Sequence, residues 1–341
     1  MTIMAERPAV ARASSTVTMT MAQALNAALR DAMNADPTVV VFGEDVGPLG
    51  GVFRVTDGLT ARFGPDRCFD TPLAESGIVG MAVGMAMNGF RPVVEMQFDA
   101  FAYPAFEQIA SHVAKYGNRT RGRVRLPMVI RIPYAGGIGG VEHHCDSSES
   151  YYAHTPGLTV VAPATVADAY ALLRHAVDSP DPVVFLEPKK LYFAKGMLDT
   201  AAAEPPIGRA VVRREGRDAT LIAYGPSVPV ALAAAEQAAT EGRDLAVVDL
   251  RSIVPFDDET VMAAVRRTGR AVVVAEAPGF ASVASEIAAR VSERCFHHLA
   301  APVRRVTGFD VPYPPPALER HHLPGVDRVL DAVDDLQWDL S

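Results

Sequence analysis

Apolar runs of strand length alternate with segments of helical period along the first 195 residues of this chain. Val39–Phe42 is a short, wholly apolar run that predicts a buried strand, and Thr20 with Gln23 forms a capping box that predicts a helix ending near Asn34. The same periodicities predict further helices over 54–62, 75–88, 103–117 and 165–177, and strands over 67–70, 92–96, 127–132 and 183–186. This alternation predicts an α/β domain with a mostly parallel sheet.

A second unit with a similar rhythm follows a stretch of altered composition. Residues 196–208 are rich in Gly, Ala and Pro, which is typical of a linker between domains. The pattern beyond them predicts strands over 219–224, 245–250, 271–276 and 303–307, and helices over 228–240, 257–268, 281–294 and 325–336. We therefore expect a flexible arm over 1–16, a first domain over 17–195, a linker over 196–208 and a second α/β domain over 209–341.

Composition narrows the class of protein. The chain has 341 residues, of which 49% are hydrophobic, and this is enough apolar material for two cores. The formal net charge of -8, without a long basic run, argues against a nucleic-acid or anionic-membrane partner. Three distant cysteines, Cys68, Cys145 and Cys295, suit neither a disulfide framework nor a zinc site, so we expect a cytoplasmic protein.

Glu75 is the most informative polar residue of the first domain. It begins a predicted helix that is otherwise apolar and rich in glycine, and Pro72 sets a turn before it. A carboxylate in apolar surroundings either reaches solvent or meets a partner that offsets its desolvation, and the unpaired N–H groups of a helix start favour an anion. The residues alone leave both readings open: a capping or surface-paired acid, or a group that does chemistry.

A glycine-rich loop followed by paired histidines forms a second chemical cluster. Residues 136–140 include four glycines, and His143 and His144 follow them with several oxygen-bearing side chains. Histidine exchanges protons near neutral pH, which makes one of the two a candidate acid or base. Adjacent side chains point in different directions, so we expect at most one to act; a metal site or a hydrogen-bonded loop is the alternative.

Two further side chains follow predicted strands. Glu44 comes directly after the strand at 39–42 and can serve as a catalytic or relay carboxylate, although acids at strand ends also simply solvate loops. Phe101 belongs to an aromatic cluster over 98–106, from which one ring can stack on a flat heterocycle; core packing is the alternative.

Several ordered motifs resemble the β subunits of thiamine-diphosphate-dependent 2-oxo acid dehydrogenases. The resemblance extends from about residue 17 to 338 and rests on Gly43–Val46, Gly51–Gly58, Phe69–Glu75, Glu95–Phe98, Pro104–Ile109, His154–Leu158 and Leu186–Lys189. The loop Glu142–Glu149 is most similar to branched-chain members, whereas pyruvate-type members usually carry a shorter loop there.

The resemblance implies a fold and a set of partners. It implies a transketolase-like pyrimidine-binding domain, a transketolase C-terminal-like domain and an α2β2 heterotetramer that delivers acyl groups to a lipoyl-bearing dihydrolipoyl acyltransferase core. The chain has no Gly-Asp-Gly motif with a downstream Asn, the usual signature for holding thiamine diphosphate with a divalent metal. The resemblance accounts for this, because the α subunit of the family holds the diphosphate and magnesium.

The resemblance also implies roles for individual residues. Glu75 matches the acid that bonds the pyrimidine nitrogen N1′, and His144 matches the histidine that assists proton transfer or lipoyl reduction, with His143 as its neighbouring rival. The remaining matches to the cofactor pocket are Leu73, Gln97, Phe101 and Glu44. Backbone carbonyls that bind a structural potassium ion in some relatives match Leu126, Met128, Val129, Ala176, Ser179 and Asp181.

We therefore expect an enzyme that carries out oxidative decarboxylation of branched-chain 2-oxo acids jointly with an α subunit. A pyruvate or acetoin dehydrogenase β subunit is the enzymatic alternative. A subunit that only scaffolds the complex is the non-enzymatic one.

Overall fold

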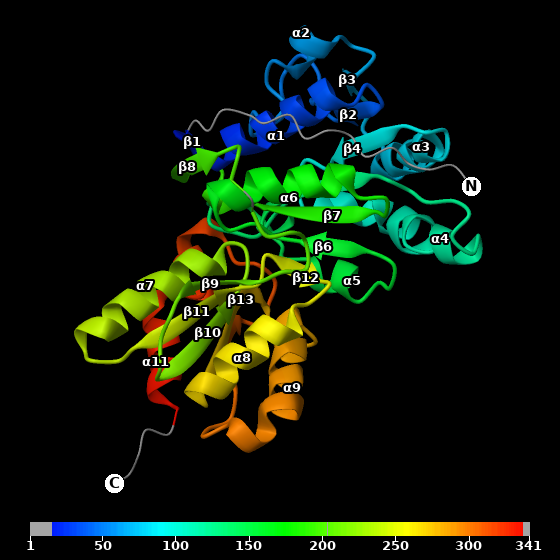
Figure 1. The fold of residues 1–341 in the computed structure, drawn as a ribbon. Coiled ribbons are helices and arrows are strands. Elements are labelled where there is room, and N and C mark those ends of the chain that lie inside the picture. Colours follow the sequence, from blue (N-terminus) through cyan, green and yellow to red (C-terminus); the bar gives the residue numbers. More distant parts are fainter. Residues whose placement is uncertain (1–15, 203, 337–341) are drawn as a thin grey trace.

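The computed structural model describes residues 16–202 and 204–336, which form two α/β lobes, one above the other in Figure 1. The first lobe contains a seven-stranded sheet of order β12-β6-β7-β5-β4-β2-β3, and the second a five-stranded sheet of order β14-β13-β10-β11-β9. All neighbouring pairs in these sheets are parallel except β12 with β6 and β9 with β11. The predicted α/β class with mostly parallel sheets is confirmed.

Helices cover both faces of the first sheet. Alternate residues of a strand face opposite sides, and in β2 the side chains of Val39 and Val41 join one core while those of Val40 and Phe42 join another. The first core is closed by α1 (Met21–Ala35) and α6 (Val166–Asp178), and the second by α3 (Glu75–Met87). The strands are β2 (Val39–Gly43), β3 (Cys68–Asp70), β4 (Arg91–Glu95), β5 (Val129–Tyr134), β6 (Thr159–Val161), β7 (Val183–Pro188) and β12 (Ser252–Val254).

The second sheet is also covered on both faces. One face packs on α7 (Ser227–Thr240) and α11 (Val326–Asp334), and the other on α8 (Asp258–Thr268) and α9 (Val283–Cys295). The core under α8 and α9 is continuous with the core under α3, so one apolar interior runs through both lobes. The strands are β9 (Val211–Arg214), β10 (Ala219–Ala223), β11 (Leu245–Asp249), β13 (Ala271–Pro278) and β14 (Arg304–Gly308).

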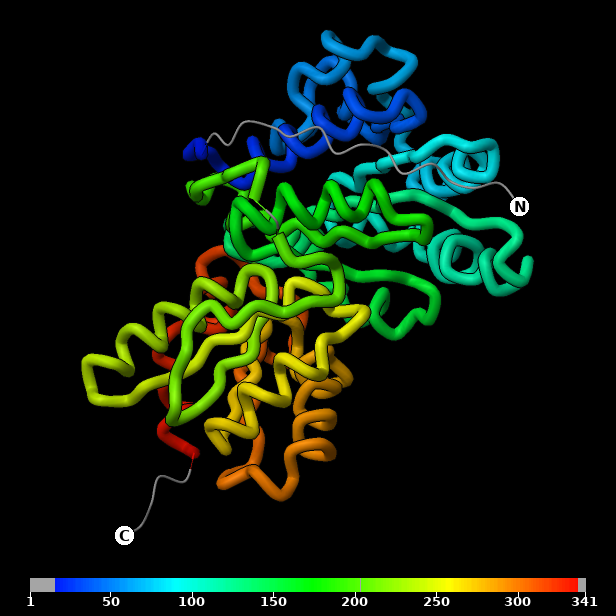
Figure 2. The backbone as a smooth tube through the Cα atoms, viewed as in Figure 1, coloured from blue at the N-terminus to red at the C-terminus, as the bar shows by residue number. Residues whose placement is uncertain are grey.

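Polar contacts and a shared strand also join the lobes. Figure 2 follows the chain from the blue-to-green lobe into the yellow-to-red lobe, and β12 then adds antiparallel to β6 of the first sheet. Buried Arg251, from the second lobe, donates through Nε to Asp168 of α6 at 2.6 Å. These contacts fix segments of the second lobe against β6 and α6 of the first lobe.

Two predicted helices differ from the structure. The prediction over 54–62 is wrong at its start, because α2 spans only Leu59–Phe63 and follows turns in which Arg54 and Gly58 have positive φ. The prediction over 103–117 gives one helix where the structure has a 3-10 helix η1 (Ala100–Ala105), a π-helix η2 (Gln108–Val113) and a short α4 (Tyr116–Arg119). Pro104 lies inside η1 and has no N–H to donate, which disfavours a regular α-helix there.

A two-stranded ribbon is absent from the sequence prediction. β1 (Thr16–Thr20) pairs antiparallel with β8 (Lys195–Asp199), so the first part of the predicted linker is a strand. Of the predicted arm, residues 1–15 lie outside the described part of the chain. The remaining short elements are η3 (Glu142–His144), α5 (Glu149–Ala153), η4 (Lys189–Leu191), η5 (Phe296–His298), η6 (Pro316–Leu318) and α10 (Glu319–His322). Among the described helices, none has the length and apolar character needed to cross a bilayer.

Candidate active site

The carboxyl ends of β2, β3 and β4 meet the start of α3 at one edge of the first sheet. Glu44 follows β2, Gln97 lies two residues beyond β4, and Glu75 is the first residue of α3. The ends of these strands lie side by side because β2 pairs in parallel with both β3 and β4. Ligands of parallel sheets bind beyond this edge, so it is the candidate active site.

Glu44 and Glu75 are carboxylates held close together with little access to water. Their side chains belong to residues that are 8% and 9% exposed, and Glu44 Oε1 has no hydrogen-bond partner among the described residues. Burial raises the pKa of Glu44, and the charges of Glu75 and Asp45 raise it further. A buried acceptor without a donor is costly, so this edge is suited to a ligand that brings one.

The other two residues predicted for this wall are placed differently. Gln97 donates through Nε2 to Asp45 Oδ2 at 2.8 Å, which orients its amide beside the Glu44 loop. Leu73, just before α3, is 79% exposed and makes part of the outer surface. An apolar side chain this exposed at a site edge is available to a second surface.

Aromatic rings connect the sheet edge to the glycine-rich loop. The Phe98 ring lies edge-on to the His144 ring at a centroid distance of 4.3 Å, and Phe101 lies edge-on to both. Phe101 and the start of α3 belong to segments that pack together, because Ser76 donates to the carbonyl of Pro104 in η1. The structure thus brings Phe101 and His144 together, on the same side of the sheet as α3.

His144 is better placed for chemistry than His143. His144 is half-buried against Phe98, whereas the His143 side chain is 50% exposed. Burial lowers the pKa of His144, and the charges of His143 and Lys189 lower it further against the opposing charge of Glu142, so the net shift favours the neutral imidazole. A neutral imidazole can accept a proton. No group of three His, Cys, Asp or Glu side chains suited to a metal ion is present among the described residues.

Two buried groups of opposite charge, Asp99 and Lys189, lie near the loop that carries His144, here called the histidine loop (residues 135–146). The Ala135 N–H donates to the Asp146 carbonyl at 2.8 Å and closes this loop. Below it, Asp99 accepts hydrogen bonds from both the backbone and the hydroxyl of Ser148. Burial raises the pKa of Asp99 and lowers that of Lys189, while their opposite charges favour the ionised forms.

The sequence prediction missed a second buried charge group inside the first sheet. Arg131 of β5 donates to Glu95 of β4 at 2.6 Å and to Glu187 of β7 at 2.6 and 2.9 Å, and the Tyr192 hydroxyl donates to Glu187 at 2.5 Å. Burial lowers the pKa of Arg131, but Glu187 and Glu95 outweigh it and raise the pKa overall. Glu95 and Glu187 lie within two of the motifs that resemble the family. Only the order of strands in the sheet, with β5 between β4 and β7, shows that one arginine joins them.

The six positions matched to potassium ligands lie near the amino ends of β5 and β7, far along the strands from the carboxylates. The Arg91 guanidinium donates there to the carbonyls of Val177 at 2.8 Å and Ser179 at 3.1 Å. A fixed cation on the Ser179 carbonyl opposes a second cation at the same oxygen. The guanidinium of Arg91 would therefore compete with a potassium ion for this one of the six matched carbonyls.

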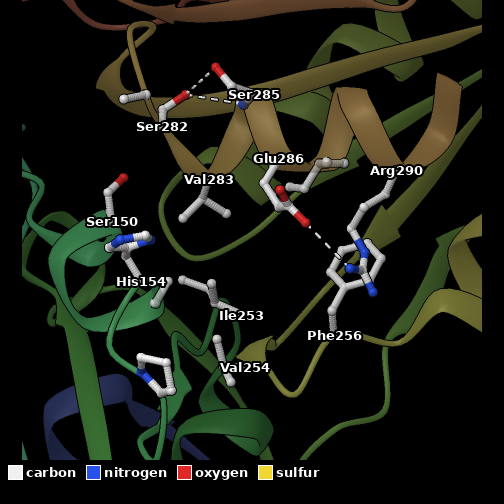
Figure 3. Close-up of a pocket in the computed structure, with 14 residues that line it drawn as sticks. Ser150, His154, Ile253, Val254, Phe256, Ser282, Val283, Ser285, Glu286 and Arg290 are labelled. Carbon is white, nitrogen blue, oxygen red and sulfur yellow. Dashed lines mark hydrogen bonds and ion pairs between the residues drawn. The ribbon is translucent and has the colours of Figure 1, made fainter. Parts of the chain in front are cut away.

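A hollow of about 740 Å³ separates α5 from α9, on the boundary between the lobes (Figure 3). In the wall of this hollow Arg290 forms an ion pair with Glu286, and its guanidinium carbon Cζ lies 5.1 Å from the centre of the Phe256 ring. Arg290 also pairs with Asp258 at 2.6 Å, so its charge is already neutralised. None of the predicted site residues is among the described residues that line this hollow, and we do not assign it to the chemistry.

Comparisons with known proteins identify the domains of this chain and its relatives. Residues 17–195 match the family model of the transketolase pyrimidine binding domain, and residues 208–329 match that of the transketolase C-terminal domain. A Mycobacterium tuberculosis protein named 3-methyl-2-oxobutanoate dehydrogenase subunit beta is 55% identical, over 98% of each chain. A Leifsonia xyli protein named pyruvate dehydrogenase E1 component subunit beta is 54% identical, over 97% of this chain and 98% of its own.

A solved structure is similar in fold. It is described as a split gene transketolase, inactive beta4 tetramer, and superposes with a TM-score of 0.73 over 93% of this chain and 98% of its own. At 24% identity this likeness concerns the fold alone.

Proposed function

This chain belongs to the E1 β subunits of the 2-oxo acid dehydrogenases, and we propose that it acts on branched-chain 2-oxo acids together with an α subunit. The observation that carries the proposal is the pair of buried carboxylates, Glu44 and Glu75. They lie at the carboxyl ends of the strands of the pyrimidine-binding domain. The branched-chain choice rests on the loop Glu142–Glu149, because the identities of 55% and 54% do not separate the two substrate classes.

Thiamine diphosphate fits the residues at this edge. When bound, the coenzyme supplies the nucleophilic carbon and the electron sink for decarboxylation. The Glu75 carboxyl would share a proton with the pyrimidine nitrogen N1′, and the helix start of α3 would stabilise its charge. Phe101 would pack on the pyrimidine ring, and Glu44, whose Oε1 lacks a partner among the described residues, would accept a hydrogen bond.

His144 is the proton-transfer group in this proposal. Its imidazole is half-buried and edge-on to both Phe98 and Phe101, and its lowered pKa favours the neutral form. We assign it to proton exchange during passage of the acyl group to the lipoyl arm of a dihydrolipoyl acyltransferase.

The surface of α3 supports an α partner. The helix is apolar on all sides, yet Met81 and Met87 are 40% and 46% exposed. A Cβ added at Gly84 would meet no atom within 4 Å, so the glycines leave room for close approach of another backbone. Apolar helix surface next to a carboxylate site is typical of an interface, and we propose that the α subunit covers it within an α2β2 heterotetramer.

Magnesium belongs to the α subunit in this proposal. The described residues of this chain offer no carboxylate or histidine cluster for it. We do not include potassium, because Arg91 already occupies the matching carbonyl of Ser179.

Co-expression with candidate α subunits, followed by carbon dioxide release from a panel of 2-oxo acids, tests the proposal. We expect 3-methyl-2-oxobutanoate to be preferred over pyruvate, and Glu75→Gln to lower turnover by roughly 100- to 10,000-fold with the heterotetramer intact. A strong preference for pyruvate would move the chain to the pyruvate class. Full activity of Glu75→Gln would favour a scaffolding subunit.

A further inference from the structure

Two carboxylates of the second lobe bind the backbone of the histidine loop. Glu319 Oε1 accepts from the N–H groups of Gly137 at 3.0 Å and Gly139 at 3.2 Å. Buried Glu276 of β13 accepts from the Gly136 N–H at 3.2 Å through Oε2. Hydrogen bonds to a charged acceptor are the stronger kind, so three backbone donors within four residues of the loop are held by groups about 140 to 180 residues away in sequence.

Neighbouring side chains hold both carboxylates in place. The Tyr313 hydroxyl donates to Glu319 Oε1 at 2.7 Å, and Lys190 Nζ lies 3.5 Å from Glu276 Oε1. Tyr313 also lies directly against Gly136, where an added Cβ would fall 1.9 Å from its hydroxyl oxygen. The absence of a side chain at Gly136 is therefore a packing requirement as well as a source of flexibility.

We propose that Glu319 and Glu276 are positioning residues that hold the histidine loop, and thereby His144, in the orientation the reaction needs. The inference rests on the proposed role of His144. Four glycines within 136–140 give the free loop many accessible conformations, and each restraint from the second lobe removes some of them. The second lobe thus contributes to turnover directly, in addition to any contact it makes with other subunits.

Glu319→Ala removes the acceptor that serves two loop amides, of which Gly137 keeps a longer bond to the Tyr313 hydroxyl at 3.4 Å. Glu319→Gln keeps an oxygen at the same place. In the complex with the α subunit we expect Glu319→Ala to lower kcat about tenfold with KM nearly unchanged, because misplacing a reacting group by about 1 Å is costly. We expect Glu319→Gln to recover most of the loss. Glu259→Ala is the matched control, since Glu259 is an 82% exposed acid of the same lobe.

Hydrogen–deuterium exchange of the full chain reads the same restraint without catalysis. We expect the amides of Gly137 and Gly139 to be protected in the wild-type chain and to exchange at least tenfold faster in Glu319→Ala, with the core strands β10 and β11 unchanged. The wild-type measurement alone is decisive if the variant does not fold, because rapid exchange of these amides would overturn the proposal.

The outcomes separate this inference from the proposed function. Loss of activity in Glu75→Gln with normal kcat and normal loop exchange in Glu319→Ala would overturn the positioning role and leave the function standing. An active Glu75→Gln with a loosened loop in Glu319→Ala would show the restraint and refute the chemistry. Equal losses in Glu319→Ala and Glu259→Ala would point to general destabilisation and would also overturn the positioning role.

Discussion

Two pairs of carboxylates in the first lobe differ in whether a cation lies beside them. Glu95 and Glu187 share the buried guanidinium of Arg131 inside the sheet. Glu44 and Glu75 lie at its carboxyl edge, close enough for the charge of Glu75 to raise the pKa of Glu44, and Glu44 has no cation beside it among the described contacts. All four residues are buried, the pair at the edge less completely, and the presence of a shared cation is the clearest difference between the sets.

This difference separates groups that maintain the fold from groups that await a ligand. A buried ion pair that is complete contributes little net stability, but breaking it leaves an uncompensated charge. A buried carboxylate without such a partner lowers the stability of the free chain. Groups of this kind cluster at functional sites. Substitutions in each set test this contrast.

The largest effect is expected from Arg131→Ala. Two buried carboxylates would lose their shared cation, and we expect a loss of about 3–5 kcal/mol in the free energy of unfolding. Arg125→Ala is the control, because Arg125 and Asp181 are 57% and 59% exposed and an exposed pair contributes at most about 1 kcal/mol. Denaturant unfolding of both variants measures the difference, and equal stabilities would show that the buried triad is not structural.

The next effect concerns turnover and is expected from His144→Ala. Loss of a proton-transfer group should lower kcat on the order of 100-fold, whereas His143→Ala should change it by less than about threefold. The two variants differ by one position in the same 3-10 turn, so they share any general effect on the loop. Steady-state kinetics of the assembled enzyme decides between them, and the reverse ranking would transfer the role to His143.

Glu44→Gln should stabilise the chain modestly at neutral pH. Because the pKa of Glu44 is raised in the folded state, its ionisation disfavours folding above its ordinary pKa of about 4.3 and does so fully once the pH exceeds the folded-state pKa. We expect an increase in Tm of roughly 2 °C at pH 8 that shrinks toward zero as the pH falls to about 4. Thermal melts across this range provide the measurement, and a gain independent of pH would contradict the assignment.

The smallest effect is expected on Tm when potassium is exchanged for sodium. Since Arg91 donates to the carbonyl of Ser179, exchanging potassium for sodium at constant ionic strength should leave Tm unchanged within about 1 °C. A potassium-specific increase, measured by differential scanning calorimetry, would show that the ion displaces or shares the position of this guanidinium.

Local signals in the sequence predicted much of the fold. The capping box of Thr20 and Gln23 is present, and the apolar run at 39–42 is the buried strand β2. Glu75 lies in the first turn of α3, as its position after Pro72 predicts. Each of these features depends on residues within four positions of one another, which is the range that periodicity and capping rules cover.

The features that the sequence prediction missed depend on distant residues. The ribbon of β1 with β8, the sharing of Arg131 by two acids and the bonds from Glu319 to the histidine loop each join segments that only the folded chain brings together. The helical segment after Phe98 is irregular because Pro104 interrupts it in a tertiary context that a helical period does not reveal. The roles of Glu75, His144 and the other matched residues stay predictions until the variants are measured.

The exposed apolar surface of α3 has a consequence for how the cell makes this chain. Met81, Met87 and neighbouring glycines face water until something covers them. Chains synthesised in excess would be substrates for chaperones and proteases, or would aggregate. In the proposed heterotetramer, unequal synthesis of the two subunits would leave this helix uncovered.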